Sequence, residues 1–328
     1  MIIVRTPTRI SFFGGGTDYP SWYENHPGAV ICATINKYSY ITVRELPPFF
    51  PYRHRIRYYD QEQVESLEAI KHPSVRECAL FLKYERGLEV VHNADLPARS
   101  GLGSSSTFTV GMLHALHALQ GYIPTKRELA EQAIHVEQER IGESVGSQDQ
   151  VAAAFGGLNY VRFWKSSFEV EPITISAERV GVLQNHLLLC FTGFARTASE
   201  IASDQIAKTA DNSNLLEEMS TITREALDLF RSPDFSMAEF GRLLNRQWNA
   251  KRQISNLITN PVLDEIHSRG MDAGAYGAKL LGAGGGGFML FVAHPESHDE
   301  IRKSLGEKMF VPFRLENTGS SVVYYSHA

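Results

Sequence analysis

Apolar and polar residues alternate loosely over residues 2–13, and this stretch ends in the three glycines at 14–16. A period of two residues indicates a strand, and consecutive glycines indicate a tight loop at its end. A second stretch of the same character covers about 29–44 and stops before Pro47 and Pro48. The N-terminal part of the chain is therefore expected to form a sheet.

The pattern changes to a helical one near residue 104. Apolar residues recur at helical spacing over 104–120, and Gly121 follows as a stop signal. A capping box, Thr125 with Glu128 three residues later, opens the next helix. A third helix is expected to begin at Ser147.

The second half of the chain mixes both patterns. A strand-rich stretch runs to about residue 192. After it, the predicted elements are helices at 197–230, 235–255 and 262–276, a glycine loop, a strand at 288–293, and a final helix and strand. The change of pattern places a domain boundary near residue 180, which gives domains 1–180 and 181–328.

The composition narrows the class of protein. The 328 residues are 43% hydrophobic and 21% charged, which is typical of a globular chain rather than a disordered or fibrous one. The formal net charge of −5 provides no overall attraction for nucleic acid or an anionic membrane. We therefore expect small-molecule partners, and a phosphorylated ligand must be held by local cations and backbone N–H groups.

The cysteines and the first residues of the chain indicate the cellular compartment in which the protein is expected. Cys32, Cys78 and Cys190 are far apart, and their spacing predicts neither a disulfide framework nor a metal site. The first residues lack the basic and apolar regions of a signal peptide, and no apolar stretch approaches the length of a membrane span. These features predict a cytoplasmic protein.

The first candidate site lies where the N-terminal strand meets its glycine loop. The strand delivers Arg9 and the loop delivers Asp18. A fixed cation can stabilise the charge on a transferring phosphoryl group, and an aspartate can accept hydrogen bonds from sugar hydroxyls. A surface arginine and a turn aspartate would fit the same pattern.

The second candidate is the segment Leu96–Thr107, which leads into a helix. Gly101 and Gly103 would let the backbone approach a polyphosphate, and the free N–H groups of the helix start would point at the anion. The serines at 104–106 offer hydroxyls to Mg²⁺ or phosphate. The segment is not a Walker A loop, because no Gly-Lys-Ser/Thr follows. An ordinary glycine–serine loop with a helix cap is the alternative.

The third candidate is the glycine run at 282–287. It formally matches the dinucleotide-binding fingerprint, but it is followed by the apolar strand pattern of 288–292 and not by a helix. We therefore reject a Rossmann site. Close approach of the backbone to a ligand or to another loop is the better explanation for so many glycines.

The fourth candidate covers residues 137–150. If Ser147 caps its helix, Asp149 lies in the first turn, where the helix dipole favours an ionised carboxylate that can accept a hydroxyl proton. Glu137, at the end of the preceding helix, is a candidate Mg²⁺ ligand, although a solvated helix face fits it as well. His114 and His117 lack further ligands and are interpreted as ordinary helix residues.

Together, these segments resemble the GHMP superfamily, which includes galactokinase, homoserine kinase and mevalonate kinase. Residues 9–18 resemble the galactokinase signature, 97–107 match the superfamily phosphate loop, and 282–287 match its C-terminal glycine loop. Glu137, Gly142, Gly146 and Asp149 follow the galactokinase order of magnesium glutamate, two glycines and catalytic aspartate.

Within the superfamily, the chain is most similar to the D-glycero-D-manno-heptose 7-phosphate kinases. The similarity lies in residues 14–20, 34–38, 156–160 and 279–284. The chain departs from galactokinase at Gly15 and Gly16, where that family has a glutamate and a histidine that contact the sugar. The absence of a carboxylate at Gly15 suits a phosphorylated substrate.

The resemblance implies an α+β fold with two domains. The N-terminal domain would resemble ribosomal protein S5 domain 2, the C-terminal domain would be ferredoxin-like, and the site would lie between them. ATP and Mg²⁺ would be the nucleotide substrate and the metal.

The resemblance also implies roles for particular residues. Asp149 would accept or orient the anomeric hydroxyl, and Arg9 would stabilise the transferring phosphoryl group. ATP would be bound by Pro97, Ser100, Gly101, Leu102, Gly103, Ser104, Ser105, Ser106, Gly284 and Gly285, with the metal nearest Ser104 or Ser105 and Glu137. The sugar would be bound by Gly15, Gly16, Thr17 and Asp18, and its phosphate by Arg196 and by Lys251 or Arg252.

The implied activity is phosphorylation of the anomeric hydroxyl of heptose 7-phosphate to the 1,7-bisphosphate, in the synthesis of nucleotide-activated heptose. Another GHMP sugar-1-kinase, for fucose or a hexose, is the nearer alternative. A sugar-sensing protein built on a dead kinase is the further one, although all of the expected motifs are intact. The sequence leaves the oligomeric state open.

Overall fold

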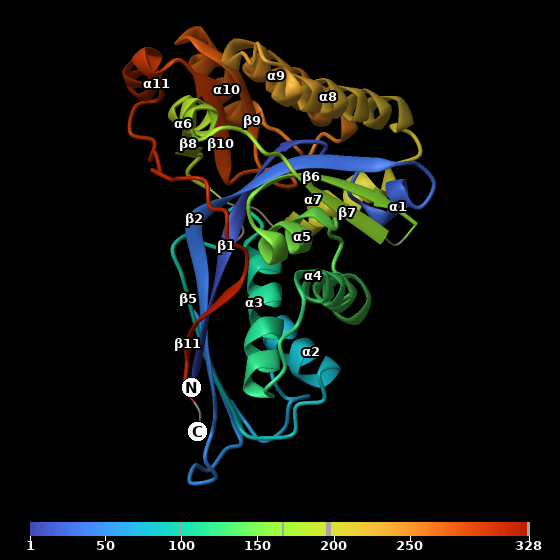
Figure 1. The fold of residues 1–328 in the computed structure, drawn as a ribbon, viewed down its shortest axis with the longest axis vertical. Coiled ribbons are helices and arrows are strands. Elements are labelled where there is room, and N and C mark those ends of the chain that lie inside the picture. The colour runs from blue at the N-terminus through green and yellow to red at the C-terminus, as the bar shows by residue number, and fades with distance from the viewer. Residues whose placement is uncertain (99, 166, 195–197, 327–328) are drawn as a thin grey trace.

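The strands of the computed structural model form two sheets (Figure 1). The structure describes residues 1–98, 100–165, 167–194 and 198–326. Within these ranges one sheet has eight strands and the other has three. Helices accompany both sheets, so the expected α+β composition is confirmed.

The larger sheet is built around a long antiparallel pair, β1 (Ile2–Phe13) and β2 (Gly28–Glu45). The order of its main path is β11-β1-β2-β5-β3-β4, while β6 pairs with β2 and β7 pairs with β6. The other strands are β3 (His54–Arg57), β4 (Gln61–Val64), β5 (Leu88–Ala94), β6 (Leu158–Trp164), β7 (Ser167–Pro172) and β11 (Ser321–Tyr325). Both strands predicted near the N-terminus are thus present.

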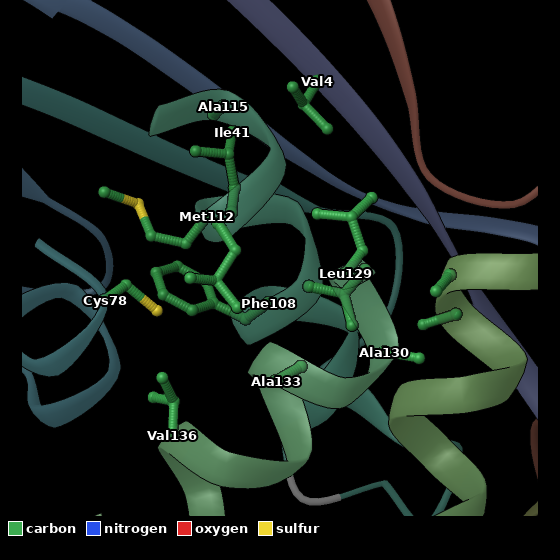
Figure 2. Packing of buried hydrophobic residues seen from close by; sticks show 14 of the residues in the cluster. Val4, Ile41, Cys78, Phe108, Met112, Ala115, Leu129, Ala130, Ala133 and Val136 are labelled. Carbon is green, nitrogen blue, oxygen red and sulfur yellow. The ribbon is translucent and has the colours of Figure 1, made fainter. Parts of the chain in front are cut away.

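Helices cover one face of the larger sheet (Figure 1). They are α2 (Pro73–Phe81), α3 (Ser104–Leu119), α4 (Lys126–His135) and α5 (Gln148–Phe155), with the short α1 (Pro20–Tyr23) beyond them and the π-helical turn η1 (Val136–Ile141) continuing α4. Figure 2 shows Phe108 and Met112 of α3 packed between Ile41 of the sheet and Leu129 of α4. The Thr125–Glu128 capping box is formed as predicted.

The smaller sheet has the strand order β8-β10-β9. Its strands are β8 (Leu187–Phe191), β9 (Ala275–Leu280) and β10 (Phe288–Ala293), and an isolated bridge joins Cys190 of β8 to Phe310. With the helices between them, these three strands and the bridge follow the chain order β-α-β-β-α-β of a ferredoxin-like domain, with the bridge in place of the last strand. The helices are α6 (Ala177–Asn185), α7 (Ala198–Ala207), α8 (Ser213–Arg231), α9 (Met237–Ile254), α10 (Pro261–Asp272), η2 (Pro295–Ser297) and α11 (His298–Leu305).

Two predicted helical stretches in this half differ from the structure in their bounds. The helix expected over 197–230 is two helices, because the Asn212 side chain donates to the carbonyls of Lys208 and Ile254 and holds a turn between them. The helix expected over 262–276 ends at Asp272, since Gly274 has a φ of +99°, and β9 follows. The glycine run therefore joins two antiparallel strands and does not follow a helix.

The end of β1 is packed against the second half of the chain. The Phe240 ring of α9 makes edge-to-face contacts with Phe12 at 5.4 Å and with Phe13 at 5.2 Å between ring centroids. All three side chains are fully buried. The first half of the chain therefore contributes to the core of the second at the point where the glycine loop begins.

The ends of the chain meet in the larger sheet, where β11 pairs with β1. The domain boundary near residue 180 falls within α6, between β7 and β8, and stays a prediction. The three cysteines are buried free thiols. In the described parts of the chain, no helix combines the length and apolar character that a membrane crossing needs.

Replacing Phe240 with alanine tests this packing. Loss of a buried phenylalanine side chain costs about 3–5 kcal/mol, so Phe240→Ala should lower the free energy of unfolding in urea by that amount. Phe49 is 88% exposed, and Phe49→Ala should change the same quantity by less than about 0.5 kcal/mol. Equal effects of the two substitutions would contradict the packing described here.

Candidate active site

A pocket of about 160 Å³ lies where six segments of the chain meet. They are the end of β1 with its glycine loop, the 101–106 loop and helix start, the 144–149 segment, α7, α9 and the C-terminal glycine run. Of the residues predicted from the sequence, those that line it are Arg9, Gly15, Gly16, Asp18, Gly101, Gly103, Ser104, Ser105, Ser106, Asp149 and Lys251. The structure thus brings together all four sequence motifs.

Arg9 and Asp149 form a two-point ion pair at this pocket. Arg9 Nε donates to Asp149 Oδ1 and Nη2 donates to Oδ2, both at 2.7 Å. Arg9 Nη1 donates to the carbonyl of Gly101 at 2.8 Å. Such a pair is planar and specific in direction, so both side chains have one fixed orientation.

One acceptor position of Asp149 is free of contacts with the residues that the structure describes. A carboxylate has about four lone-pair positions, and Arg9 takes two while Gln148 Nε2 donates weakly to Oδ1 at 3.4 Å. The Oδ2 atom lies beside the 101–106 loop, since a methyl group at Gly103 would come within 3.1 Å of it. A hydroxyl bound at Oδ2 would therefore lie next to that loop.

Asp18 is buried and organises its own loop. Its carboxylate accepts from the N–H of Gly16 at 2.8 Å and from the N–H of Gln148 at 3.3 Å. Burial raises the pKa of Asp18 above its ordinary value, and the nearby Asp149 acts in the same direction. Thr17 does not line the pocket, and its hydroxyl bonds the carbonyls of Gly14 and Ala29. Thr17 therefore stabilises the conformation of the glycine loop without facing the pocket.

Lys251 of α9 is a buried cation in the pocket. Its Nζ donates to the carbonyl of Gly282 at 2.6 Å. Burial lowers the pKa of Lys251 to about 8, because removal from water disfavours the charged form. The adjacent Arg252 instead pairs with Asp264 at 2.9 Å and does not line the pocket. Arg196 lies outside the described residues.

Glu137 is fully buried beneath the start of α3, so its interpretation as a solvated face is wrong. Its Oε2 accepts from Ser106 Oγ at 2.8 Å and from the Gln150 side chain, while Oε1 has no hydrogen-bond partner among the residues that the structure describes. Burial raises the pKa of Glu137 to about 7. The residue belongs to η1, and single π-helical turns are frequent at functional sites.

Ser106 is the serine that meets Glu137, whereas the sequence favoured Ser104 or Ser105. Ser104 is half-buried and Ser105 is exposed, and both line the pocket. A sequence signal for Ser106 is its place four and seven residues before the apolar Val110 and Leu113, which puts it on the helix face that packs inward.

The C-terminal glycine run contacts the 97–107 loop directly. A methyl group at Gly282 would lie 2.6 Å from the Gly101 Cα, and one at Gly287 would lie 2.3 Å from the Ser100 carbonyl oxygen. Both glycines also have positive φ values. The prediction of close backbone approach is confirmed, and the partner is another loop.

Several predicted nucleotide contacts do not line the pocket. Pro97 is exposed, and Ser100 and Leu102 are buried beneath the loop. The Gly285 N–H donates to the carbonyl of Ile258 at 2.8 Å, and Gly284 also faces Ile258. The described residues contain no cluster of histidine, cysteine and carboxylate side chains suited to a metal ion. His114 bonds Ser320 and His117 bonds Gln132, as expected of ordinary helix residues.

Comparison with known proteins places this geometry in context. The model of the GHMP kinases N terminal domain matches residues 71–157, and that of the GHMP kinases C terminal matches residues 224–311. A D-glycero-alpha-D-manno-heptose 7-phosphate kinase of Campylobacter jejuni is 31% identical over 317 residues, which cover 93% of each chain. An L-fucokinase/L-fucose-1-P guanylyltransferase of Bacteroides fragilis is 31% identical over 255 residues, which cover 72% of this chain and 26% of that protein.

Solved structures show the same architecture. A D-glycero-D-manno-heptose 1-phosphate kinase from Bacteroides thetaiotaomicron superimposes with a TM-score of 0.74 at 25% identity, with 100% of both chains covered. A galactokinase of Lactococcus lactis complexed with galactose gives a TM-score of 0.77 at 19% identity and covers 98% of this chain and 94% of that one. The second likeness shows the fold alone.

The burial of Glu137 predicts a pH-dependent stability. The pKa of Glu137 is about 7 in the folded protein, whereas the ordinary value is 4.5. Between these two pH values the folded protein binds more protons at this site than the unfolded chain does. The free energy of unfolding therefore falls as pH rises through this window. Glu137→Gln removes this loss. In metal-free buffer the variant should therefore gain stability over wild type from pH 5 to pH 8, by as much as about 3 kcal/mol.

Urea denaturation at the two pH values measures this gain. The matched control is Glu265→Gln on the exposed part of α10. This substitution should change the free energy of unfolding by the same amount at pH 5 and at pH 8. If the variant and the wild type differ in free energy of unfolding by the same amount at pH 5 and pH 8, the Glu137 carboxyl does not titrate in this window.

Proposed function

Because the chain belongs to the GHMP kinases, it is an ATP-dependent phosphotransferase, and we propose that its acceptor is a phosphorylated heptose. The reaction would move the γ-phosphoryl group of ATP to the anomeric hydroxyl of D-glycero-D-manno-heptose 7-phosphate and give the 1,7-bisphosphate and ADP. The named activity of the C. jejuni relative supports this choice of substrate. The product would feed the synthesis of nucleotide-activated heptose.

The main observation behind the proposal is that Asp149 and Lys251 line the same pocket. Asp149 offers an open acceptor position beside the phosphate loop, where the hydroxyl that attacks ATP must lie. Lys251 offers a buried ammonium group from the other half of the chain. A substrate with a hydroxyl at one end and a phosphate at the other suits this arrangement.

The nucleotide would lie on the phosphate loop and the start of α3. Residues 104–106 begin this helix, so their N–H groups have no partners in the preceding turn and can bind phosphate oxygens. Arg9 lies between this loop and Asp149, where it can also stabilise charge on the transferring group. Phosphoryl transfer depends mostly on positioning and charge stabilisation, so few groups are needed.

The residues present fit a magnesium ion. Within the described parts of the chain, one buried oxygen of Glu137 has no hydrogen-bond partner, and Ser106 donates its hydroxyl to the other oxygen. Mg²⁺ is typically held by one or two carboxylates together with substrate phosphates and water. Glu137 and Ser106, with Ser104 and Ser105 at the pocket surface, would hold the ion, which would neutralise charge on the ATP phosphates.

Gly15 and Gly16 support a phosphorylated acceptor. A methyl group at Gly15 would come within 3.9 Å of Lys251 Nζ, so a carboxylate side chain at this position would compete for the same cation. With glycine there, Lys251 can bind a substrate phosphate, and Arg196 is proposed as a second cation for it. The predicted contacts of Asp18 with the sugar hydroxyls belong to the same proposal.

Two alternatives differ in the acceptor or in the activity itself. The fucokinase relative favours a sugar-1-kinase for an unphosphorylated sugar, and the B. thetaiotaomicron structure is named for a heptose 1-phosphate. A protein that binds sugar without turnover is the second alternative. An ATPase-coupled assay with mannose, fucose, heptose, heptose 1-phosphate and heptose 7-phosphate separates all of these outcomes.

Asp149→Asn should reduce kcat by about 10² to 10⁴-fold, the usual contribution of a positioned general base. ATP binding, measured by calorimetry, should be retained because the phosphate loop is unchanged. Asp264→Asn removes an aspartate that is also paired with an arginine but lies outside the pocket, and it should leave kcat unchanged. Retention of more than about a tenth of the wild-type rate by Asp149→Asn would contradict the mechanism.

Lys251→Met should weaken use of the phosphorylated sugar but not of ATP. A charge-assisted hydrogen bond to phosphate contributes about ten- to a hundredfold in affinity, so kcat/KM for heptose 7-phosphate should fall by that factor. In the wild type this kcat/KM should also fall as pH rises through about 8, where Lys251 loses its charge.

Initial rates measured with mannose, heptose and heptose 7-phosphate show which sugar is the preferred acceptor. The pH effect should be confined to the phosphorylated sugar and absent from Lys251→Met. If the unphosphorylated sugars are used as efficiently as heptose 7-phosphate, the heptose 7-phosphate assignment is wrong and a sugar kinase of another specificity is left.

A further inference from the structure

We propose that Lys279 is a positioning residue, which fixes the two pocket carboxylates through Ser11 and Gln148. The inference rests on the proposed kinase function and adds a residue that lies outside the pocket. Lys279 belongs to β9 in the smaller sheet, and only 1% of its surface is exposed. The carboxylates that it would position belong to the other half of the chain.

The Lys279 ammonium group is bound to the backbone of β1. Its Nζ donates to the carbonyls of Ser11 and Phe12, at 2.8 Å in both cases. Among the described residues it forms no salt bridge. Burial lowers the pKa of Lys279 well below its ordinary value, and the cations of Lys251 and Arg9 act in the same direction.

The backbone at Ser11 and Phe12 needs such a donor. The β1–β2 register shifts between Ser11 and Phe13, which marks a bulge. A bulge interrupts the ladder of hydrogen bonds and re-aims side chains. On its other side, β1 is paired with β11 only as far as Arg5. Lys279 therefore stabilises an irregular stretch of β1 that a regular sheet would not hold.

The Ser11 side chain, next to the bulge, contacts the residue that binds both carboxylates. Ser11 Oγ donates to Gln148 Oε1 at 2.9 Å. Gln148 in turn donates its backbone N–H to Asp18 Oδ2 at 3.3 Å and its side-chain Nε2 to Asp149 Oδ1 at 3.4 Å. A continuous set of contacts thus runs from Lys279 to the Asp149 carboxylate, whose other oxygen, Oδ2, has the open acceptor position.

A purely space-filling role does not account for this residue. An apolar side chain of similar length would fill the same volume without the cost of burying an ammonium group. It could not, however, bind two carbonyls and hold the bulge. Lys279 also lies three residues before Gly282, so the strand that positions the carboxylates also leads into the glycine run against the phosphate loop.

The test is a double-mutant cycle between Lys279 and Ser11. Lys279→Met should lower kcat about 10- to 100-fold, the effect of a small misplacement of a reacting group, while the KM for ATP stays unchanged. Ser11→Ala should also lower kcat. The double variant should be no more than about threefold slower than the slower single variant, because both substitutions interrupt one set of contacts.

Lys126→Met is the matched control. Lys126 Nζ also donates to a main-chain carbonyl, that of Phe155, at 2.7 Å, but the residue is exposed and far from the pocket. This variant should keep the wild-type kcat. Thermal unfolding of every variant shows whether a change in kcat comes only from lost structure.

Three results would overturn the proposal. They are a wild-type kcat in Lys279→Met, a wild-type kcat in Ser11→Ala, and effects that multiply fully in the double variant. Ser11 itself lines the pocket, so a lower kcat in Ser11→Ala alone does not support the proposal. If Lys279→Met does not fold, Lys279→Gln takes its place in the cycle, with the same expected results. A wild-type protein that phosphorylates no sugar would instead contradict the proposed function, which separates the two failures.

Discussion

The ion pair between Arg9 and Asp149 is the contact on which the rest of the pocket depends. The two residues are 140 positions apart, one on β1 and the other at the start of α5. A guanidinium removed from water needs a partner for its N–H groups, and here the carboxylate and the Gly101 carbonyl supply them. The pair therefore holds β1, α5 and the phosphate loop in one arrangement, and the open oxygen of Asp149 follows from it.

The two halves of the chain contribute different chemistry to this arrangement. The first half supplies the acidic groups, Asp18, Asp149 and the buried Glu137, and it also supplies the phosphate loop. Arg9 also comes from the first half, while the second half supplies two lysines and backbone: Lys251 in the pocket, Lys279 behind it and the glycine run against the phosphate loop. Because the glycines bring two backbones into contact, these loops can adjoin one ligand without side chains between them.

Much of the candidate site could be predicted from short stretches of sequence. The helix start that carries Asp149, the Thr125 capping box and the approach of the two glycine loops are all present. The errors have two causes. The turn at Asn212 depends on a hydrogen bond to the distant Ile254 carbonyl, which no local pattern contains. The end of α10 follows from the positive φ of Gly274, and the strand after it forms by pairing with β10.

The sequence by itself determined the motifs and the family resemblance, because these depend on the type and spacing of residues a few positions apart. Only the tertiary structure decided which side chains meet. Neighbours on a helix differ by about 100° in direction, so the rotation of α9 places Lys251 in the pocket and Arg252 against Asp264. The rotation of α3 likewise selects Ser106 for Glu137. Those rotations are set by packing between elements far apart in the chain, and only the folded protein brings them together.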